Sequence, residues 1–177
     1  MEEKQIALIR GINVGKAKRI AMADLRTLLE ELGCSGVKTV LNSGNAVYST
    51  QATAAESAQR IEAEIQKRFH FSAKVMVITA EELRVIIEQN PLAAVADNPS
   101  RLLVAVFSED MELSKLQPLA EKDWSPDAFG LGSKAAYLWC PEGVLESPVP
   151  EALGKLVGEK STTRNWGTML KLWELVK

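Results

Sequence analysis

The residues best suited to chemistry lie early in the chain, in the stretch LIRGINVGKAKR at positions 8–19. An apolar run ends there at Arg10. The candidate ligand-binding residues are Arg10, Gly11, Asn13, Gly15, Lys16 and Lys18. Glycine lets backbone N–H groups approach a ligand closely, and cationic side chains attract anions. The stretch therefore predicts a site for an anion such as a phosphate group, although its glycine spacing matches neither a P-loop nor a G-x-G-x-x-G fingerprint.

Two further polar stretches supply the remaining candidates. The turn LNSGN, at positions 41–45, contributes Ser43, Gly44 and Asn45. The stretch KSTTRNWGT, at positions 160–168, contributes Arg164 and Asn165. We expect Thr162 or Thr163 to cap the last helix, which places Arg164 in its first turn, where a cation opposes the helix dipole. Arg164 then needs a partner, which is either a group of the protein or a ligand.

Catalytic and metal-binding constellations are missing from the sequence. His70 is the only histidine, and Cys34 and Cys140 have neither C-x-x-C spacing nor a neighbouring histidine. A catalytic triad and a zinc site are therefore difficult to build, and no pair of carboxylates is placed for acid–base work. We expect no metal, no cofactor and two reduced cysteines. Whether the protein is an enzyme stays uncertain, and no catalytic residue can be named.

Hydrophobic periodicity divides the first half of the chain into six elements. We expect strands over residues 5–9, 37–41, 45–49 and 74–78, and a helix over 22–32. A capping box at residues 53–56 opens the second helix. The order strand, helix, strand, strand, helix, strand is that of a ferredoxin-like unit, whose antiparallel sheet has the strand order 4-1-3-2.

The second half repeats this order in part. A helix opens at the capping box of residues 79–82 and ends before Pro91, and a connector follows. We then expect strands over 102–107, 128–131 and 135–139 and helices over 113–122, 150–157 and 164–176, without a clear fourth strand. The predicted fold is α+β, with two ferredoxin-like subdomains that have antiparallel sheets. The second subdomain is degenerate and is followed by a C-terminal helix. The predicted boundaries are 1–79 for the first subdomain, 80–100 for a helix and connector, and 101–177 for the second.

The predicted strand order brings two of the polar stretches together. In a 4-1-3-2 sheet the exit of the first strand lies beside the entry of the third, so residues 10–13 should lie close to residues 42–45. A helix that begins near residue 22 offers unpaired backbone N–H groups at the same end. The alternative is structural: the glycines serve turns, the asparagines bond loop backbone, and the cations form a solvated face. The sequence leaves open whether residues 160–168 reach this corner.

These motifs together resemble a bacterial family known as domain of unknown function sixteen-ninety-seven. The stretches that carry the resemblance are RGINVG, MADLRTLLEELG, NSGNAVYS and STTRNW, which span most of the chain. The family pattern falls on Arg10, Gly11, Asn13, Gly15, Lys18, Ser43, Gly44, Asn45, Thr162, Thr163, Arg164, Asn165, Trp166 and Thr168. Three residues depart from it: Lys16 replaces a usual second glycine, Asn42 a glutamine and Gly167 an asparagine. The resemblance implies two ferredoxin-like subdomains and no established biochemical activity.

Composition and charge rank the remaining function classes. The formal net charge is −2, which argues against a protein that coats DNA. An RNA-recognition domain stacks bases on exposed aromatics of its first and third strands, but here the first strand has none and the third has only Tyr48. We therefore expect a cytoplasmic protein that binds a small anionic ligand, such as a nucleotide or phosphate ester, at the Arg10–Asn45 corner. A weak single-stranded nucleic-acid binder and a protein-interaction module are the alternatives, and membrane association is not expected.

Overall fold

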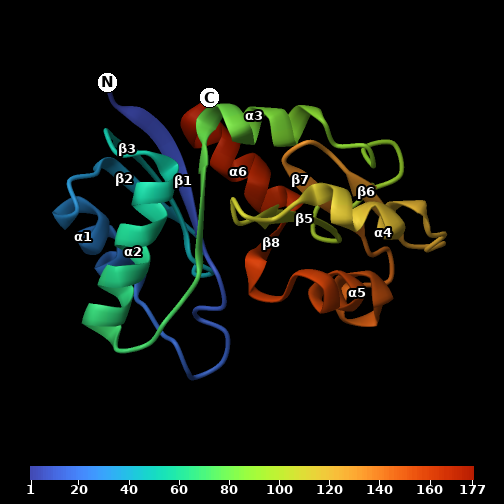
Figure 1. Ribbon diagram of the computed structural model, residues 1–177, viewed down its shortest axis with the longest axis horizontal. Coiled ribbons are helices and arrows are strands. Elements are labelled where there is room, and N and C mark those ends of the chain that lie inside the picture. Colours follow the sequence, from blue (N-terminus) through green and yellow to red (C-terminus); the bar gives the residue numbers. More distant parts are fainter. The chain divides into compact units, whose positions relative to one another are not determined.

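The computed structural model describes residues 1–177, and the chain divides into two compact units (Figure 1). Unit 1 contains Met1–Glu81 and Leu172–Lys177, and unit 2 contains Glu82–Lys171. None of the helices combines the length and the apolar character that a membrane span requires.

Unit 1 has the predicted order of elements. These are β1 (Glu3–Ile9), α1 (Met22–Glu31), β2 (Ser35–Val40), β3 (Asn45–Thr50), α2 (Ala54–Phe69) and β4 (Val75–Thr79). Its sheet has the order β2-β3-β1-β4, with every neighbouring pair antiparallel. The predicted ferredoxin-like topology is thus confirmed for this half.

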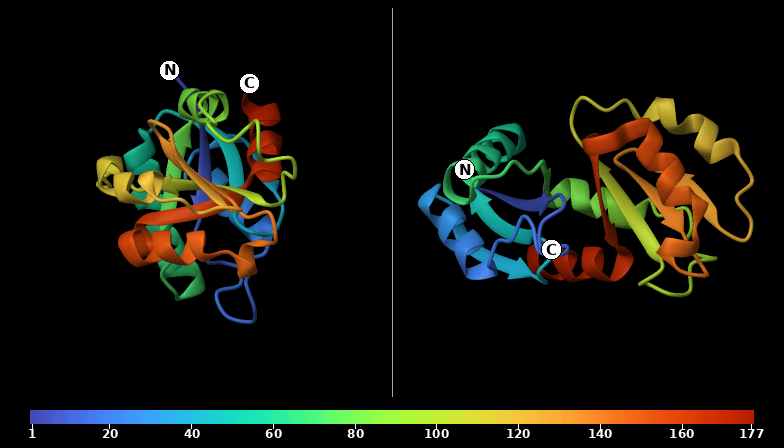
Figure 2. Two further views of the ribbon diagram at one scale, coloured as in Figure 1. Left: turned by 90° about the vertical axis from the view of Figure 1, so that its right-hand side faces the viewer. Right: turned by 90° about the horizontal axis from the view of Figure 1, so that it is seen from below.

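Alternation along the strands positions the core of unit 1. Ala7 and Ile9 of β1 pack in the core cluster on the side of the sheet that α1 and α2 cover. Figure 2 shows these two helices on one side of that sheet. The two strand residues pack with residues such as Leu28 of α1 and Ile61 of α2, all of them fully or almost fully buried. The start of α2 is fixed by the expected capping box, in which the Thr53 hydroxyl accepts from the Glu56 N–H and Glu56 accepts from the Thr53 N–H. The core and this cap together hold both helices on one side of the sheet.

Unit 2 contains a second sheet with the same topology. Its strands are β5 (Leu102–Phe107), β6 (Ala128–Leu131), β7 (Ala135–Trp139) and β8 (Ser161–Asn165), and its helices are α4 (Gln117–Glu121) and α5 (Pro148–Val157). The order is β6-β7-β5-β8, again antiparallel throughout. The α+β fold of two antiparallel four-stranded sheets with interleaved helices is therefore confirmed. The second copy is reduced most clearly at α4, where a 3-10 turn (Leu113–Leu116) precedes a single short helix, and α5 is also shorter than α2.

Two helices complete the chain. The helix α3 (Ala80–Glu88) follows β4 directly, and in unit 2 the Tyr137 hydroxyl of β7 donates to the Ile86 carbonyl of α3 at 2.5 Å. The helix α6 (Trp166–Val176) begins in unit 2 and ends in unit 1. The α3 helix ends before Asn90 and Pro91, as the sequence predicts.

The start of the last helix differs from the prediction. Residues 161–165 form β8, the fourth strand that the sequence analysis did not find, because they pair with β5 from Phe107 back to Leu103. The helix begins only at Trp166, and the Asn165 side chain caps it by accepting from the Thr168 N–H at 2.9 Å. The expectation that a threonine caps this helix is wrong, since Thr162 and Thr163 lie inside the strand.

Candidate anion-binding site

Three segments meet at one end of the sheet of unit 1. Ile9 is paired with Val75, and Leu8 with Asn45, so the exit of β1 lies between the β2–β3 turn and the α2–β4 loop. The Ile9 N–H donates to the Gly44 carbonyl at 2.9 Å, and the Arg10 N–H donates to the Lys74 carbonyl at 2.8 Å. The predicted meeting of residues 10–13 with residues 42–45 is confirmed.

Asn13 fixes the loop that joins β1 to α1. Its side-chain NH₂ group donates to the carbonyls of Ile20 (2.9 Å) and Asn42 (2.6 Å), and its side-chain oxygen accepts from the Ile20 N–H (2.9 Å). Its backbone adopts the left-handed conformation with φ 58°, which asparagine tolerates better than most residues. Ile12 and Ile20 are buried on either side of the loop. The amide of Asn13 is thus occupied inside the protein and gives the loop a defined shape.

Gly44 and Asn45 shape the hairpin beside this loop. A Cβ on Gly44 would lie 2.9 Å from Ile12 Cδ1 and 3.1 Å from Ile9 Cβ, and its φ is +92°. Asn45 is fully buried, and its side chain donates to the Val40 carbonyl and to the Ser43 hydroxyl, each at 2.8 Å. Gly44 and Asn45 therefore have clear structural roles, as the structural interpretation of the sequence predicts.

Gly11 and Gly15 also have positive φ values, 71° and 73°, but a side chain at either position would meet open space. These two glycines permit the turns of the loop through their positive φ values. No other part of the protein packs closely against either of them.

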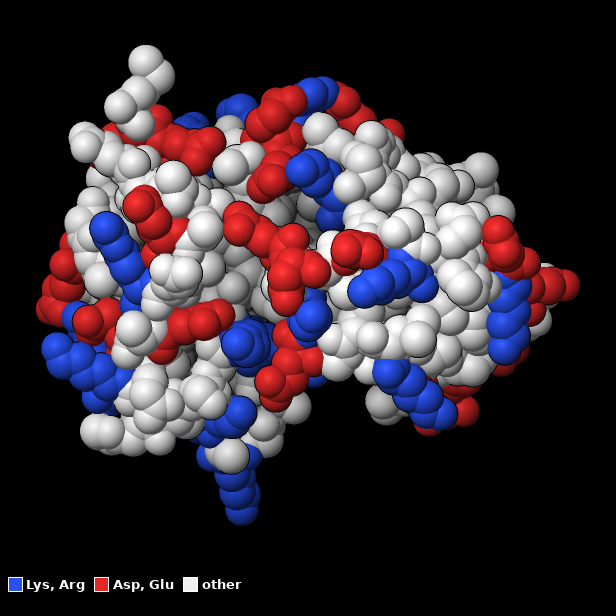
Figure 3. All heavy atoms as spheres, in the orientation of Figure 1, with Lys and Arg blue, Asp and Glu red and all other residues white.

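The outer surface of this end of the sheet is strongly cationic. Residues 9–23, 41–45 and 70–75 contain no aspartate or glutamate, and their cations are Arg10, Lys16, Lys18, Arg19 and Lys74. We call these five residues the cationic end of unit 1. Lys16, Lys18, Arg19 and Lys74 are exposed, whereas Arg10 is half-buried. In Figure 3, Lys and Arg side chains project at the lower edge, where Figure 1 draws the β1–α1 loop.

The surroundings of the cationic end add little negative charge. On α2, one carboxylate oxygen of Glu62 accepts from the Val75 N–H at 2.9 Å. Asp24 lies in the first turn of α1, where a carboxylate is favourable. Lys16 and Lys18 form no ion pair, and Arg19 donates only to the Gly15 carbonyl at 3.2 Å. The α1 helix begins here without a side-chain cap, so its first N–H groups add to the positive potential.

The two candidates in unit 2, Arg164 and Asn165, make hydrogen bonds within that unit. Arg164 is 9% exposed, and it donates to the Thr162 hydroxyl at 2.7 Å and to the Thr163 carbonyl at 2.9 Å. Burial lowers the pKa of Arg164 to about 10, so it keeps its charge at neutral pH. Asn165 caps α6 with its side-chain oxygen. The expectation that Arg164 lies in a helical turn is wrong, because it belongs to β8.

Lys74 is the member of the cationic end that sequence reasoning missed. The predicted strand order contained the signal, because the entry of the fourth strand lies beside the exit of the first in a 4-1-3-2 sheet. No group of three or more His, Cys, Asp or Glu side chains is placed to hold a metal ion, and both cysteines are free thiols.

Comparison with known proteins agrees with this architecture. The sequence profile of a family described as "Protein of unknown function (DUF1697)" matches residues 2–137. The solved structure of the conserved bacterial protein SP0830 from Streptococcus pneumoniae is similar over 100% of both chains, with a TM-score of 0.82 and 21% sequence identity. This likeness shows a shared fold. No curated protein matches the chain.

Proposed function

We propose that this chain, which belongs to the DUF1697 family of proteins of unknown function, binds a small anionic ligand at the cationic end of unit 1. The ligand class is a nucleotide or another phosphate ester. Lys16, Lys18, Arg19 and Lys74 supply the charge, while Asn13 and Gly44 hold the loop and hairpin that carry it.

One observation carries the proposal: two segments that are far apart in sequence place five cations at one end of a sheet, in a chain of net charge −2. Neither these segments nor the β2–β3 turn beside them contains a carboxylate of its own. Like charges gathered on one surface repel each other, which disfavours the arrangement unless an anion offsets it. The shape of the loop is set by the Asn13 side chain, so the cations do not depend on a ligand to bring them together.

The alternative of a single-stranded nucleic-acid binder is less well supported. Tyr48 is 2% exposed and lies in the core beneath α1 and α2, so it cannot act as a stacking platform for a base. A phosphate chain could still contact the exposed lysines, but such binding would be weak and would fall with salt, by roughly 0.7–0.9 in log–log slope for each phosphate neutralised.

A cytoplasmic location is part of the proposal. Two cysteines that remain free thiols are typical of a reducing compartment.

Ligand-dependent thermal stability tests the proposed function. We expect nucleotides or other phosphate esters to raise the melting temperature of the wild type, since a ligand that binds only the folded state stabilises it by about 2.7 kcal/mol at a hundred times its dissociation constant. The double variant Lys16→Gln/Lys18→Gln should lose this gain. Lys155→Gln/Lys171→Gln is the matched control, because it removes the same charge and both lysines are exposed and lie in unit 2.

Arg10→Lys asks whether the guanidinium contributes as well. Lysine keeps the positive charge but cannot donate two parallel hydrogen bonds. We expect the variant to fold and to lose the phosphate-dependent gain in melting temperature. A wild type that shows no gain across a broad panel of phosphate esters, or a double variant that keeps the full gain, would contradict the proposal.

A further inference from the structure

Unit 1 exposes two large apolar side chains at its cationic end. Apart from Met1 at the N-terminus, Val14 and Leu41 are the large apolar residues that this unit leaves exposed, by 76% and 52%. The Asn13 side chain donates to the Asn42 carbonyl at 2.6 Å, so each apolar residue is the direct chain neighbour of one partner in this hydrogen bond. Single exposed apolar residues are normal on a protein surface, but these two lie at one end of the sheet, among cations.

The β1–α1 loop, which carries Val14, is closed at its base and projects from the sheet. The Asn13 N–H donates to the Lys18 carbonyl at 3.0 Å, and residues 14–17, with the sequence VGKA, form the exposed tip. This loop extends past the end of β1 in Figure 1 and in the left view of Figure 2. Val14 and Lys16 can therefore reach a flat surface together.

The backbone of Leu41, in the β2–β3 turn, is strained. Its φ is 59°, a left-handed conformation that asparagine and glycine adopt more readily than leucine. Burial does not offset this cost, because half of the side chain is exposed. Strained residues cluster at ligand-binding and other functional sites. The conformation of Leu41 therefore points to a contact with a partner outside the chain.

We propose that the cationic end docks on the surface of a membrane that contains anionic phospholipids, and that Val14 and Leu41 insert among the headgroups. The inference rests on the proposed function, because the phosphate ester bound at the cationic end is then a phospholipid headgroup. Membrane association was not expected from the sequence, which does not show that Val14 is exposed while Ile12 and Ile20 of the same loop are buried.

Charge complementarity argues for this occupant. Each Lys or Arg close to an anionic bilayer strengthens binding by about fivefold, and an anionic surface is typical of the cytoplasmic leaflet. The binding of a peripheral segment scales with its buried apolar area plus its attraction to anionic lipids, and the cationic end offers both. A soluble nucleotide would use the cations but would leave Val14 and Leu41 in water.

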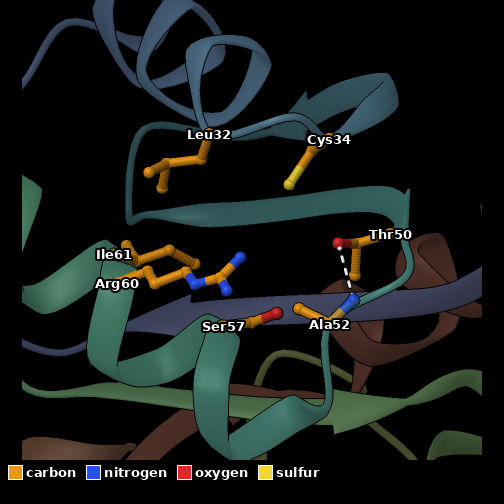
Figure 4. A pocket seen from close by; sticks show the side chains of 7 residues that line it. All are labelled: Leu32, Cys34, Thr50, Ala52, Ser57, Arg60 and Ile61. Atoms are coloured by element: carbon orange, nitrogen blue, oxygen red, sulfur yellow. Dashed lines mark hydrogen bonds between the residues drawn. The ribbon is translucent and has the colours of Figure 1, made fainter.

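The opposite end of the same sheet provides a reference for charge. Near the end of β3 lies a small pocket lined by Cys34, Ser57 and Arg60, among others (Figure 4). Its volume of about 10 Å³ holds a single water molecule, so no headgroup enters it. Arg60 is exposed. The six residues of β3 span about 20 Å, roughly two Debye lengths in about 0.1 M salt, so the charge of Arg60 is screened from the cationic end.

Cosedimentation with lipid vesicles tests the inference on the full chain. We expect the wild type to bind vesicles made of equal parts of phosphatidylcholine and phosphatidylglycerol, and to bind pure phosphatidylcholine at least about tenfold more weakly. Lys16→Gln should weaken binding to the mixed vesicles about fivefold. Arg60→Gln removes the same charge from the other end of the sheet and should change binding by less than about twofold.

A second pair of variants tests the apolar side chains. Val14→Asn/Leu41→Asn keeps every charge, and asparagine suits the left-handed backbone at position 41. We expect its melting temperature not to fall, and its affinity for the mixed vesicles to drop at least about tenfold. Val95→Asn/Leu145→Asn is the matched control and should bind as the wild type does, because it removes a valine and a leucine that are exposed in unit 2.

The outcomes separate this inference from the proposed function. Val14→Asn/Leu41→Asn should keep the full gain in melting temperature with soluble phosphate esters. A wild type that shows this gain but binds mixed and neutral vesicles equally would overturn the membrane inference alone. The same holds if Val14→Asn/Leu41→Asn binds mixed vesicles like the wild type, or if Lys16→Gln and Arg60→Gln lose equally. A wild type with neither property would contradict both proposals.

Discussion

Replacing Gly44 with alanine should lower the free energy of unfolding by about 2–5 kcal/mol, from two separate causes. The backbone at Gly44 has φ +92°, and an L-residue with positive φ costs about 1–2 kcal/mol. The new Cβ would also lie 2.9 Å from Ile12 Cδ1 and 3.1 Å from Ile9 Cβ. Crowding of this kind in a packed core costs typically about 1–3 kcal/mol.

Gly11→Ala is the matched control for the second cause. Its φ is also positive, at 71°, but a Cβ at this position meets nothing within 4 Å. Only the backbone contribution of about 1–2 kcal/mol should remain. Urea unfolding followed by circular dichroism gives both values, provided that the slope of free energy against urea stays constant among the variants. If Gly44→Ala is no more destabilising than Gly11→Ala, the contact between the loop and the hairpin at Ile12 does not contribute as inferred.

Three further outcomes are expected. Asn13→Ala should lower the free energy of unfolding by about 1–3 kcal/mol, because the Ile20 N–H and two carbonyls lose their partner; faster amide hydrogen exchange at Ile20 would report the loosened loop. Asn165→Ala removes the cap that accepts from the Thr168 N–H, so urea unfolding should show a loss of about 0.5–2 kcal/mol. Burial raises the pKa of Tyr137 to about 12, so its contribution to stability is complete below pH 10 and is lost as the pH rises through 12. Between pH 10 and 12 the melting temperature should therefore fall less steeply with pH for Tyr137→Phe than for wild type. Equal dependence on pH in the two proteins would contradict a raised pKa of Tyr137 in the folded state.

The sequence predicted the elements of the fold wherever apolar residues recur at a clear period. Strand Leu102–Phe107, for example, reads LLVAVF and was predicted with its observed bounds. Strand β8 was not predicted, because its residues are STTRN and show no apolar alternation. It is their pairing with β5 that forms the strand. The cap of α6 was misplaced for the same reason, since Thr162 and Thr163 favour helix starts only when they are not already held in a sheet.

The candidate site was predictable in its location but not in the roles of its residues. Strand order placed residues 10–13 beside residues 42–45, and the structure agrees. No sequence pattern could show that the amide of Asn13 is bonded to Ile20 and Asn42, because those contacts depend on the path of the loop. The close contact between Gly44 and Ile12 could not be predicted either, because it forms only when the hairpin and the β1–α1 loop have both folded.

Unit 1 is built from two segments at opposite ends of the chain, which has a consequence for folding during protein synthesis. Residues 172–177 belong to unit 1, although the 90 residues of unit 2, Glu82–Lys171, are translated between them and the rest of that unit. Leu172 is fully buried and Val176 almost so. At roughly 5–20 residues per second, a ribosome needs about 5–18 s to make the intervening segment. The nascent unit 1 therefore lacks its last six residues for at least that time.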